Sequence, residues 1–296
     1  MKFFWKVLIL SPIFITIILF LLTAYQKPSS NIATNNSDVS SIIHQSEFIL
    51  MGDTGTGSKE QYKVAGAIKN HCATKNCKAL FILGDVIYDH GVESVSDEQF
   101  KTKFEDPYRN ISLPFYIVYG NHDYLGCTDC YIKYSMVSKK WKMPERYYLT
   151  EFDDISFYAV DTENLNSEQI KWLVEKLSAD TNAWKIVIGH RPLMTYEKTK
   201  IDEGWSGKSQ LKDAICNYAN FYISGHSHVL EIPGKIDGCK VEQFISGGGG
   251  AGLREVNKPY RGKFFAEENG FLVLSLFDTD LKISFFNENT ELLFSQ

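Results

Sequence analysis

The chain has 296 residues, of which 44% are hydrophobic and 14% aromatic, so it is long enough to bury one substantial core. Its formal net charge is −5 at pH 7, and its 31 Lys and Arg residues form no basic stripe along the sequence. Because affinity for a phosphate backbone depends on clustered Lys and Arg side chains, this composition argues against a nucleic-acid-binding protein.

The N-terminal segment has the pattern of an export signal. Lys2 and Lys6 precede an uncharged apolar run of 18 residues, Val7 to Ala24. This run is longer than the roughly 7–15 apolar residues of a typical cleaved signal and just shorter than the ~20 that span a bilayer. Two outcomes stay open for residues 1–25: a cleaved signal peptide, or a retained anchor that attaches the protein to a membrane through residues 7–24.

In either case the rest of the chain is expected outside the cytoplasm, in the periplasm or secreted. Residues 26–45 are rich in Ser and Asn and predict a flexible linker, which leaves residues 46–296 as one folded domain. The sequence makes no prediction of the oligomeric state.

The six cysteines agree with export, because an even number of cysteines in an exported chain favours disulfides. Sequence separation makes Cys72–Cys77, Cys127–Cys130 and Cys216–Cys239 the simplest of about 15 possible pairings. The segment Cys127-Thr128-Asp129-Cys130 could instead be a redox or zinc motif, but neither a thioredoxin-like context nor a second ligand pair is visible. A structural disulfide is therefore the favoured interpretation there.

Strand-like and helix-like patterns alternate along the chain, which is typical of an α/β domain. In chain order, they predict a strand at 48–51, a helix at 59–73 behind Ser58 as N-cap, a strand at 80–83, a helix at 96–104 and a strand at 115–119. Paired strands follow at 147–152 and 155–160, around Asp153-Asp154. Next come a helix at 167–177 with Asn166 or Ser167 as N-cap, a strand at 185–188, a helix at 208–218, and strands at 221–224, 241–245, 271–277 and 281–286.

Five of these strands end alike: an apolar run meets a glycine, and a polar residue that can bind a metal follows. Ligands collect outside the carboxyl ends of strands in α/β sheets, so we expect these residues to converge on one crevice. The converging set is Asp53, Asp85, Tyr88, Asn121, His122, His190, His226 and His228.

This set holds more ligands than one metal ion needs. One ion uses about four to six ligands, whereas two ions ~3.5–4 Å apart that share a carboxylate would use the set fully. Two carboxylates and a phenol offer anionic oxygens that suit a hard ion, and the amide and imidazole donors suit a divalent ion. The sequence therefore predicts an asymmetric site for two metals.

The motifs around these residues resemble, in order and spacing, those of the calcineurin-like metallophosphoesterases. They are Gly52-Asp53-Thr54-Gly55, Gly84-Asp85-Val86-Ile87-Tyr88, Gly120-Asn121-His122-Asp123, Gly189-His190 and Gly225-His226-Ser227-His228. Within that superfamily the chain looks like a purple acid phosphatase, because Gly55 stands where most relatives have a metal-binding His and Tyr88 matches the phenolate ligand of the iron enzymes. The segments 121–126 and 246–250 look most like the small, tartrate-resistant type.

The resemblance runs from about Glu47 to Phe286 and implies an α/β fold of four layers, in which two mixed β-sheets are flanked by α-helices. Residues 46–296 would then be the catalytic domain. The resemblance also implies how the ligands divide: Fe(III) would bind Asp53, Asp85, Tyr88 and His228, and a divalent metal (Fe, Zn or Mn) would bind Asp85, Asn121, His190 and His226.

The activity that this resemblance implies is that of an acid phosphatase, which hydrolyses small phosphate monoesters with a metal-bound hydroxide as nucleophile. His122 would protonate the leaving alkoxide or steady the phosphate, because neither metal needs it as a ligand. Two alternatives stay open: a phosphodiesterase or nucleotidase on the same site, and a non-catalytic, membrane-tethered binding protein. The complete ligand set speaks against the second.

Some residues stand apart from these motifs. Arg191 follows His190 where the small enzymes usually carry an aromatic residue, which leaves substrate preference open. No long inhibitory insertion lies between Asp161 and Ser167, so we expect no activation by loop cleavage. Asp123 is expected to orient His122 or a ligand.

Two further predictions concern residues outside the ligand set. His44, His71 and His90 are assigned no metal role. The glycine run at 247–250 is either a close approach of the backbone to the site or a flexible turn.

Overall fold

The computed structural model describes residues 45–152 and 154–296. The predicted export segment at 1–25, nearly all of the predicted linker at 26–45, and His44 lie outside the described residues. Among the helices of the described part, none combines the length and the apolar character that crossing a membrane requires.

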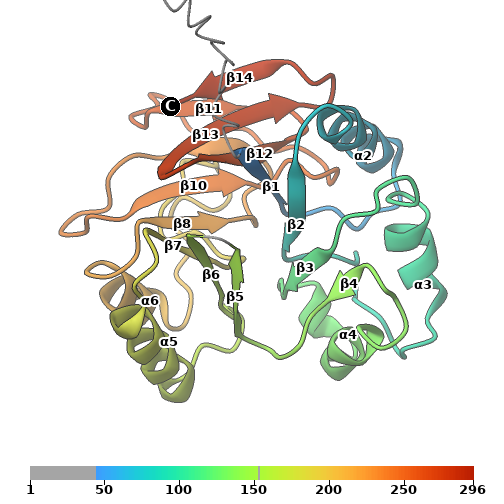
Figure 1. The fold of residues 1–296 in the computed structure, drawn as a ribbon, viewed down its shortest axis with the longest axis horizontal. Coiled ribbons are helices and arrows are strands. Elements are labelled where there is room, and N and C mark those ends of the chain that lie inside the picture. The colour runs from blue at the N-terminus through green and yellow to red at the C-terminus, as the bar shows by residue number, and fades with distance from the viewer. Residues whose placement is uncertain (1–44, 153) are drawn as a thin grey trace, which may run out of the picture. The chain divides into compact units, whose positions relative to one another are not determined.

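Seven strands of the described chain form a first mixed sheet, in the order β14-β13-β12-β1-β2-β3-β4 (Figure 1). Its centre is a parallel ladder of β1 (Gln45–Met51), β2 (Cys77–Leu83) and β3 (Phe115–Val118), which the short β4 (Trp141–Lys142) extends. Antiparallel pairing adds β12 (Gly270–Phe277), β13 (Asp280–Asn287) and β14 (Leu292–Ser295) on the other side of β1. The central strands read as continuous apolar runs because both of their faces are buried.

Seven more strands form the second sheet, in the order β11-β9-β10-β8-β7-β6-β5. Its parallel part consists of β6 (Ile155–Ala159), β7 (Trp184–Ile188), β8 (Phe221–Ser224) and β10 (Glu242–Ser246). The antiparallel strands are β5 (Tyr148–Phe152), β9 (Leu230–Ile232) and β11 (Phe264–Ala266). The predicted pairing of the strands on either side of 153–154 is therefore confirmed.

The two sheets face each other across an aromatic core. The ring centroid of Phe157, in β6, lies 5.2 Å from that of Phe48 in β1 and 4.3 Å from that of Phe81 in β2. In Figure 1, α2 (Lys59–Cys72), α3 (Glu98–Phe100) and α4 (Thr128–Tyr134) lie beside the first sheet, and α5 (Ser167–Ala179) and α6 (Lys208–Ile215) beside the second. This order of layers confirms the predicted four-layer α/β fold.

Most predicted elements form close to their predicted bounds. The Ser58 hydroxyl accepts a hydrogen bond from the Gln61 N–H at the start of α2, and Asn166 caps α5 in the same way. The helix predicted at 96–104 differs, because its α-helical part begins after Asp97 and the chain then winds into a π-helical turn, Lys101–Glu105. Helix α4 and the short strands β4, β9, β11 and β14 carry no pattern long enough to predict them.

The three predicted disulfides are confirmed. Cys72–Cys77, Cys127–Cys130 and Cys216–Cys239 are bonded, and no cysteine of the described chain is free. The Cys127–Cys130 bridge joins the N-cap residue of α4 to its first turn.

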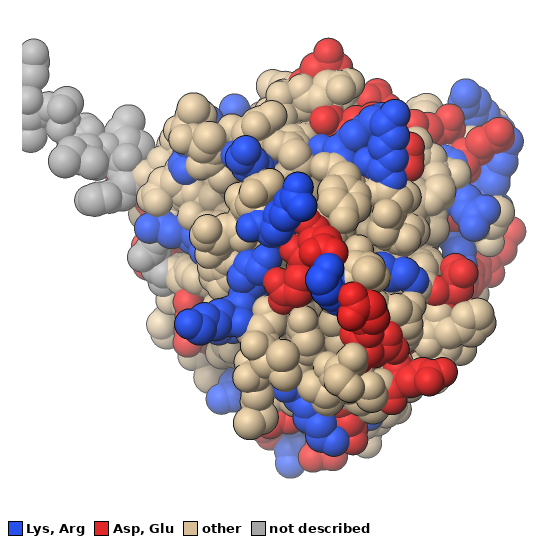
Figure 2. Space-filling model, turned by 90° about the vertical axis from the view of Figure 1, so that its right-hand side faces the viewer, with Lys and Arg blue, Asp and Glu red and all other residues tan. Residues whose placement is uncertain are grey.

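Charged residues of both signs are interspersed on the face that Figure 2 shows, which is the side of α2, α3 and α4 in Figure 1. Exposed ion pairs of these elements agree with that pattern: Lys63 Nζ lies 2.7 Å from Glu288 Oε1, and Lys101 Nζ lies 2.6 Å from Asp106 Oδ2. Such exposed pairs contribute little to stability, because water screens both charges.

His71, to which the sequence analysis gave no metal role, makes a buried ion pair instead. Its Nε2 lies 2.6 Å from Glu47 Oε2, with the two side chains 8% and 3% exposed. Burial raises the pKa of Glu47, but the hydrogen bond and the charge of His71 outweigh that effect and hold the pKa below its ordinary value of 4.5. The pair therefore stabilises the fold only while Glu47 is ionised.

We expect Glu47→Gln to lower the free energy of unfolding by about 2 kcal/mol at pH 7, because it weakens a buried, charge-assisted hydrogen bond. The folded-state pKa is depressed, so the contribution is present above the unfolded pKa of 4.5 and is lost as the pH falls through the folded pKa. Denaturant unfolding of both proteins at several pH values measures this. Lys63→Gln, which breaks an exposed pair, is the control and should change little; a Glu47→Gln effect that grows towards acid pH would contradict the assignment.

Candidate metal centre

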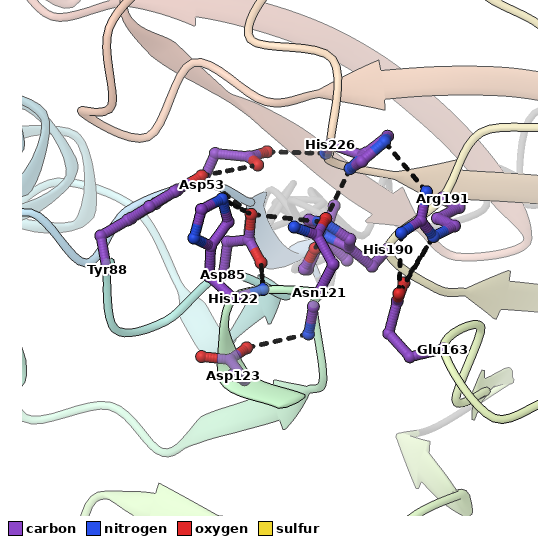
Figure 3. A network of polar contacts seen from close by, with 12 residues as sticks. Asp53, Asp85, Tyr88, Asn121, His122, Asp123, Glu163, His190, Arg191 and His226 are labelled. Carbon is purple, nitrogen blue, oxygen red and sulfur yellow. Dashed lines mark hydrogen bonds and ion pairs between the residues drawn. The ribbon is translucent and has the colours of Figure 1, made fainter. Parts of the chain in front are cut away.

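The carboxyl ends of five parallel strands bring the predicted site residues together where the two sheets meet (Figure 3). The sheets approach so closely here that a Cβ added to Gly52 would lie 3.0 Å from the Cα of Gly225. The ends of β1, β2 and β3 supply Asp53, Asp85, Tyr88, Asn121 and His122, and the ends of β7 and β8 supply His190, His226 and His228. All eight residues thus lie in one site, and their assignment as ligands or catalyst stays a prediction.

One half of the site is built around the hydroxyl of Tyr88. This oxygen lies 3.1 Å from Asp53 Oδ1, 2.9 Å from Asp85 Oδ2 and 3.1 Å from His228 Nε2. Donor atoms around an ion at ~2.1 Å lie ~3 Å apart, so these spacings suit four ligands of a single ion. They are the four residues that the sequence analysis assigned to Fe(III).

The other half is built around His190. Its Nε2 lies 3.5 Å from Asp85 Oδ2, 3.2 Å from Asn121 Oδ1 and 3.1 Å from His226 Nδ1. Asp85 Oδ2 therefore belongs to both halves, as a carboxylate that bridges two ions would. These residues are the set assigned to the divalent metal.

The imidazole rings are oriented through their outer nitrogens. His190 Nδ1 lies 2.8 Å from the Leu83 carbonyl oxygen, and His228 Nδ1 lies 2.7 Å from the Gly252 carbonyl oxygen. In the neutral ring each of these nitrogens donates to the carbonyl, so the inner Nε2 presents a lone pair to the site. These nitrogen lone pairs lie close to carboxylate oxygens, which also carry lone pairs. Such groups repel each other unless a cation lies between them, so the arrangement suits a bound cation.

The site contains two carboxylates that are almost completely buried, Asp53 at 0% and Asp85 at 2% exposure. Within the described chain no Lys or Arg pairs with either of them, and their ion-pair partners are histidines. Burial raises the pKa of Asp85, but the charge of His190 and the hydrogen bond to it outweigh this effect and hold the pKa well below its usual range. An ionised, buried carboxylate needs nearby positive charge, which metal ions would supply.

Burial and the charges of Asp53 and Asp85 raise the pKa of the Tyr88 hydroxyl far above its ordinary value of 10.0. A hydroxyl in this position keeps its proton unless a strong cation takes the proton's place, which is how Tyr binds Fe(III). The chemistry of the donor set therefore fits the metals that the sequence analysis assigned.

The backbone is strained at three of the predicted ligands. Asp53, Asp85 and His226 have φ angles of 58°, 51° and 67°, in the left-handed region that residues other than Gly rarely adopt. Each such residue costs on the order of 1–3 kcal/mol, so the surrounding structure has to hold it in place. Strain of this kind at three converging side chains is typical of a functional site.

The glycine run at 247–250 is a close approach of backbone to the site, and the interpretation as a flexible turn is wrong. A Cβ at Gly247 would lie 1.9 Å from the Ser227 carbonyl oxygen and 2.9 Å from Asp53 Oδ2, and one at Gly249 would lie 2.3 Å from the Gly52 carbonyl oxygen. A side chain at either position would therefore push the loops that carry Asp53 and His226 apart.

Asp123 supports the site through backbone rather than through His122. Its carboxylate accepts hydrogen bonds from the N–H groups of Val86, Ile87 and Gly120 and from the Tyr131 hydroxyl. It thereby ties the segment after β2 to the segment after β3. The expectation that Asp123 orients His122 directly is not met, but its hydrogen bonds do fix the two segments that carry predicted ligands.

His122 lies at the open side of the site, with 32% of its side chain exposed. Its Nδ1 lies 2.6 Å from the Asp89 carbonyl oxygen, and its Nε2 lies 4.0 Å from Asp85 Oδ2. The ring packs against Tyr88, with centroids 4.4 Å apart. Its Nε2 is therefore close to the predicted metals without being part of either ligand half.

Sequence reasoning missed two acidic residues beside the site. Glu203 Oε2 lies 2.8 Å from His226 Nε2, so the carboxylate orients that ring and leaves Nδ1 facing His190. Arg191 binds Glu163 through Nε and Nη2 and binds Glu203 through Nη1 at 2.7 Å (Figure 3 shows its contact with Glu163). The Arg191 guanidinium is therefore paired with two carboxylates. From the sequence, one can expect only that an Arg beside a metal ligand pairs with acidic residues. The sequence does not identify Glu163 and Glu203 as those partners.

A second group of metal-ligand residue types lies near Glu47, His71 and Cys77. Cys77 is in a disulfide and His71 is paired with Glu47, so this group is not a metal site. His90 is exposed to solvent.

We expect Glu203→Ala to weaken binding of the divalent ion about 10- to 100-fold, because His226 loses the carboxylate that orients it. Competition with a chromogenic chelator, followed by elemental analysis, measures this affinity. Glu255→Ala removes an exposed carboxylate whose ion-pair partner is Lys198 and not a predicted metal ligand, so it serves as the matched control. Equal affinities in the two variants would show that Glu203 does not support the metal ligand.

Comparison with known proteins agrees with this geometry. The model of the calcineurin-like phosphoesterase family matches residues 46–230, a range that contains all eight predicted site residues. Tartrate-resistant acid phosphatase type 5 from Homo sapiens is 27% identical over 222 residues, which cover 62% of this chain and 67% of that protein. The Sus scrofa protein of the same name is 26% identical over 296 residues, covering 83% of this chain and 85% of that protein.

Two solved structures share the fold. GAP50, the anchor in the inner membrane complex of Plasmodium, matches with a TM-score of 0.73 at 23% identity, over 85% of this chain and 88% of that chain. Purple acid phosphatase PPD1 from yellow lupin matches with a TM-score of 0.67 at 18% identity, over 85% of this chain and 53% of that chain. At these identities the structures bear on the fold alone. With the family model covering more than half of its length, the chain belongs to the calcineurin-like phosphoesterase family, and its relatives include the tartrate-resistant and purple acid phosphatases.

Proposed function

We propose that the protein is an acid phosphatase of the purple acid phosphatase type, which hydrolyses small phosphate monoesters at an Fe(III)–M(II) centre. The observation that carries this proposal is the position of the Tyr88 hydroxyl, within 3.1 Å of Asp53, Asp85 and His228. A phenol among two carboxylates and an imidazole is a ligand set for a hard, trivalent ion. Bound there, two cations would neutralise a phosphate and lower the pKa of a water molecule for attack on phosphorus.

The protein's own residues would do the rest. Asp85 would hold the two cations at one spacing, because its Oδ2 faces both halves of the site. His190 and His226 would hold the divalent ion, with Glu203 fixing the His226 ring. Arg191 is bound by Glu163 and Glu203, so we assign it to the support of His226 rather than to phosphate.

His122 would act on the leaving group. Its Nδ1 can donate to the Asp89 carbonyl oxygen, which leaves Nε2 as the exchangeable position on the open side of the site. A ring held in this way can deliver a proton from Nε2 to an alkoxide that leaves the phosphorus.

We also propose that the domain works outside the cytoplasm. The described chain carries three disulfides, which persist in oxidising compartments. The apolar run from Val7 to Ala24 would provide the export signal or the anchor.

The proposal is tested with the purified full chain by elemental analysis and by assays at acid pH. We expect two metals per chain, one of them iron, and hydrolysis of p-nitrophenyl phosphate well above that of bis-p-nitrophenyl phosphate. Preference for the diester would favour the phosphodiesterase alternative. A metal-free, inactive protein would favour a non-catalytic binding protein, and either result would overturn the proposal.

Tyr88→Phe should remove a visible absorption band from the protein, because only a phenolate bound to Fe(III) gives such a charge-transfer band. The Phe ring fills nearly the same space, so the fold should remain. Absorption spectra of both proteins at equal iron content measure this. Tyr124→Phe, which also removes a phenol near the site but outside the ligand set, is the control, and a band that survives in Tyr88→Phe would show that Tyr88 does not bind iron.

His122→Ala should lower kcat about 10²–10⁴-fold while both metals stay bound, because it removes a general acid and no ligand. Steady-state kinetics together with elemental analysis of the same sample separates the two effects. The loss should be smaller for a leaving group of low pKa, such as p-nitrophenol, than for an alkyl alcohol. Full turnover of alkyl phosphates by the variant would remove His122 from the mechanism.

A further inference from the structure

A cavity of about 530 Å³ lies beside α6, and most of the polar side chains that line it are cationic. Lys208 and Lys212 line it from the first and last turns of α6, Lys235 from the loop between β9 and β10, and Arg261 from the segment that precedes β11. Asp237 is the acidic residue of its lining. Four positive charges against one negative charge give the cavity a net charge opposite to that of the chain as a whole, which is −5.

The four cations are also unpaired. In the part of the chain that the structure describes, none of them forms an ion pair with a carboxylate, and the contact of Lys208 Nζ is with the Glu203 carbonyl oxygen at 3.5 Å. Some lysines elsewhere, such as Lys63 and Lys101, have carboxylate partners, whereas others, such as the exposed Lys139 and Lys282, have no carboxylate partner among the described residues and do not line the cavity. Like charges gathered around one cavity repel each other, and an anion bound between them would relieve that repulsion.

The walls of this cavity are held in place. The Cys216–Cys239 disulfide joins the end of α6 to the loop that carries Lys235. In the same loop Ile236 is 7% exposed and belongs to the buried cluster that contains Leu211 of α6. The backbone segments that carry the cations of α6 and of the loop are therefore fixed relative to each other.

The cavity adjoins the candidate metal centre. A narrow hollow beside it is lined by His226 and Glu203, and Met194 and Lys208 line both the hollow and the cavity. Because the hollow has a volume of only about 10 Å³, Met194 and Lys208 would have to move before a molecule bound near His226 could extend into the basic cavity. Both side chains are long and flexible, so their movement would open such a path.

We propose that the basic cavity is a second phosphate site, which receives the distal phosphate of a substrate that carries more than one phosphate group. This inference rests on the proposed function for the first phosphate. The argument for anion binding in the cavity depends on its unpaired cations and not on the metal centre. The second phosphate site and the proposed function can therefore fail separately.

The test compares two substrates with the full, metal-loaded chain: p-nitrophenyl phosphate, which has one phosphate, and inorganic tripolyphosphate. The double variant Lys212→Glu/Lys235→Glu reverses two charges of the cavity and touches no predicted metal ligand. We expect kcat/KM for tripolyphosphate to fall about tenfold or more, mainly through KM, and kcat/KM for p-nitrophenyl phosphate to stay within about twofold. Equal losses on both substrates, or none, would overturn the substrate role of the cavity.

Lys139→Glu/Lys282→Glu is the matched control, because both lysines are exposed and neither lines the cavity. It changes the net charge by the same amount, so a similar loss there would show a long-range charge effect and no site.

A binding measurement separates failure of the cavity from failure of the proposed function. Isothermal titration of the full chain with a bis-methylene triphosphate, which cannot be hydrolysed at its bridges, requires no turnover. We expect the Lys212→Glu/Lys235→Glu variant to bind it about tenfold more weakly than the wild type and the control variant do. Equal affinity in all three proteins would overturn the second phosphate site whatever the enzyme's activity.

Discussion

Two buried carboxylates that have no Lys or Arg partner in the described chain constrain the rest of the molecule. Asp53 and Asp85 sit where the carboxyl ends of strands from two sheets meet, and burial of negative charge there is stable only with positive charge close by. The neighbouring features serve that requirement: histidines whose outer nitrogens face carbonyls, left-handed backbone at three residues, and a glycine run that lets chain segments touch. The fold holds these groups together in an arrangement that metal ions would complete.

The strand ends and the order of their motifs were enough to predict the fold and the residues that converge, because each ligand follows a buried apolar run and a glycine. The glycine run could not be assigned from the sequence, since only the positions of Ser227 and Gly52 show that a side chain would not fit. Short strands escaped prediction because two to four residues carry too little pattern. Glu203 escaped because it lies in a loop, where contacts depend on how the chain folds back and leave no periodic signal.

Arg191 shows how a departure from a family pattern can be absorbed. A cation placed next to His190 would repel metal ions if its charge were free. Glu163 and Glu203 bind it, so the three side chains together carry one net negative charge, and Glu203 also orients His226. A residue that looked like a change in substrate recognition is thus, in the structure, part of the support for a predicted ligand.

The division of the site between two sheets also bears on the order in which the protein matures. Asp53, Asp85, Tyr88 and Asn121 come from the first half of the chain, whereas His190, His226 and His228 come from later residues, and β1 pairs with β12, more than 200 positions downstream. Contacts between residues so far apart in the sequence form late in folding, because closing a large loop costs conformational entropy before the contact can stabilise the chain. No ribosome-bound fragment that ends before His226 contains all the residues of either predicted ligand half. Metal uptake would therefore follow synthesis of most of the chain, and it would lock the first-made strands to later-made ones.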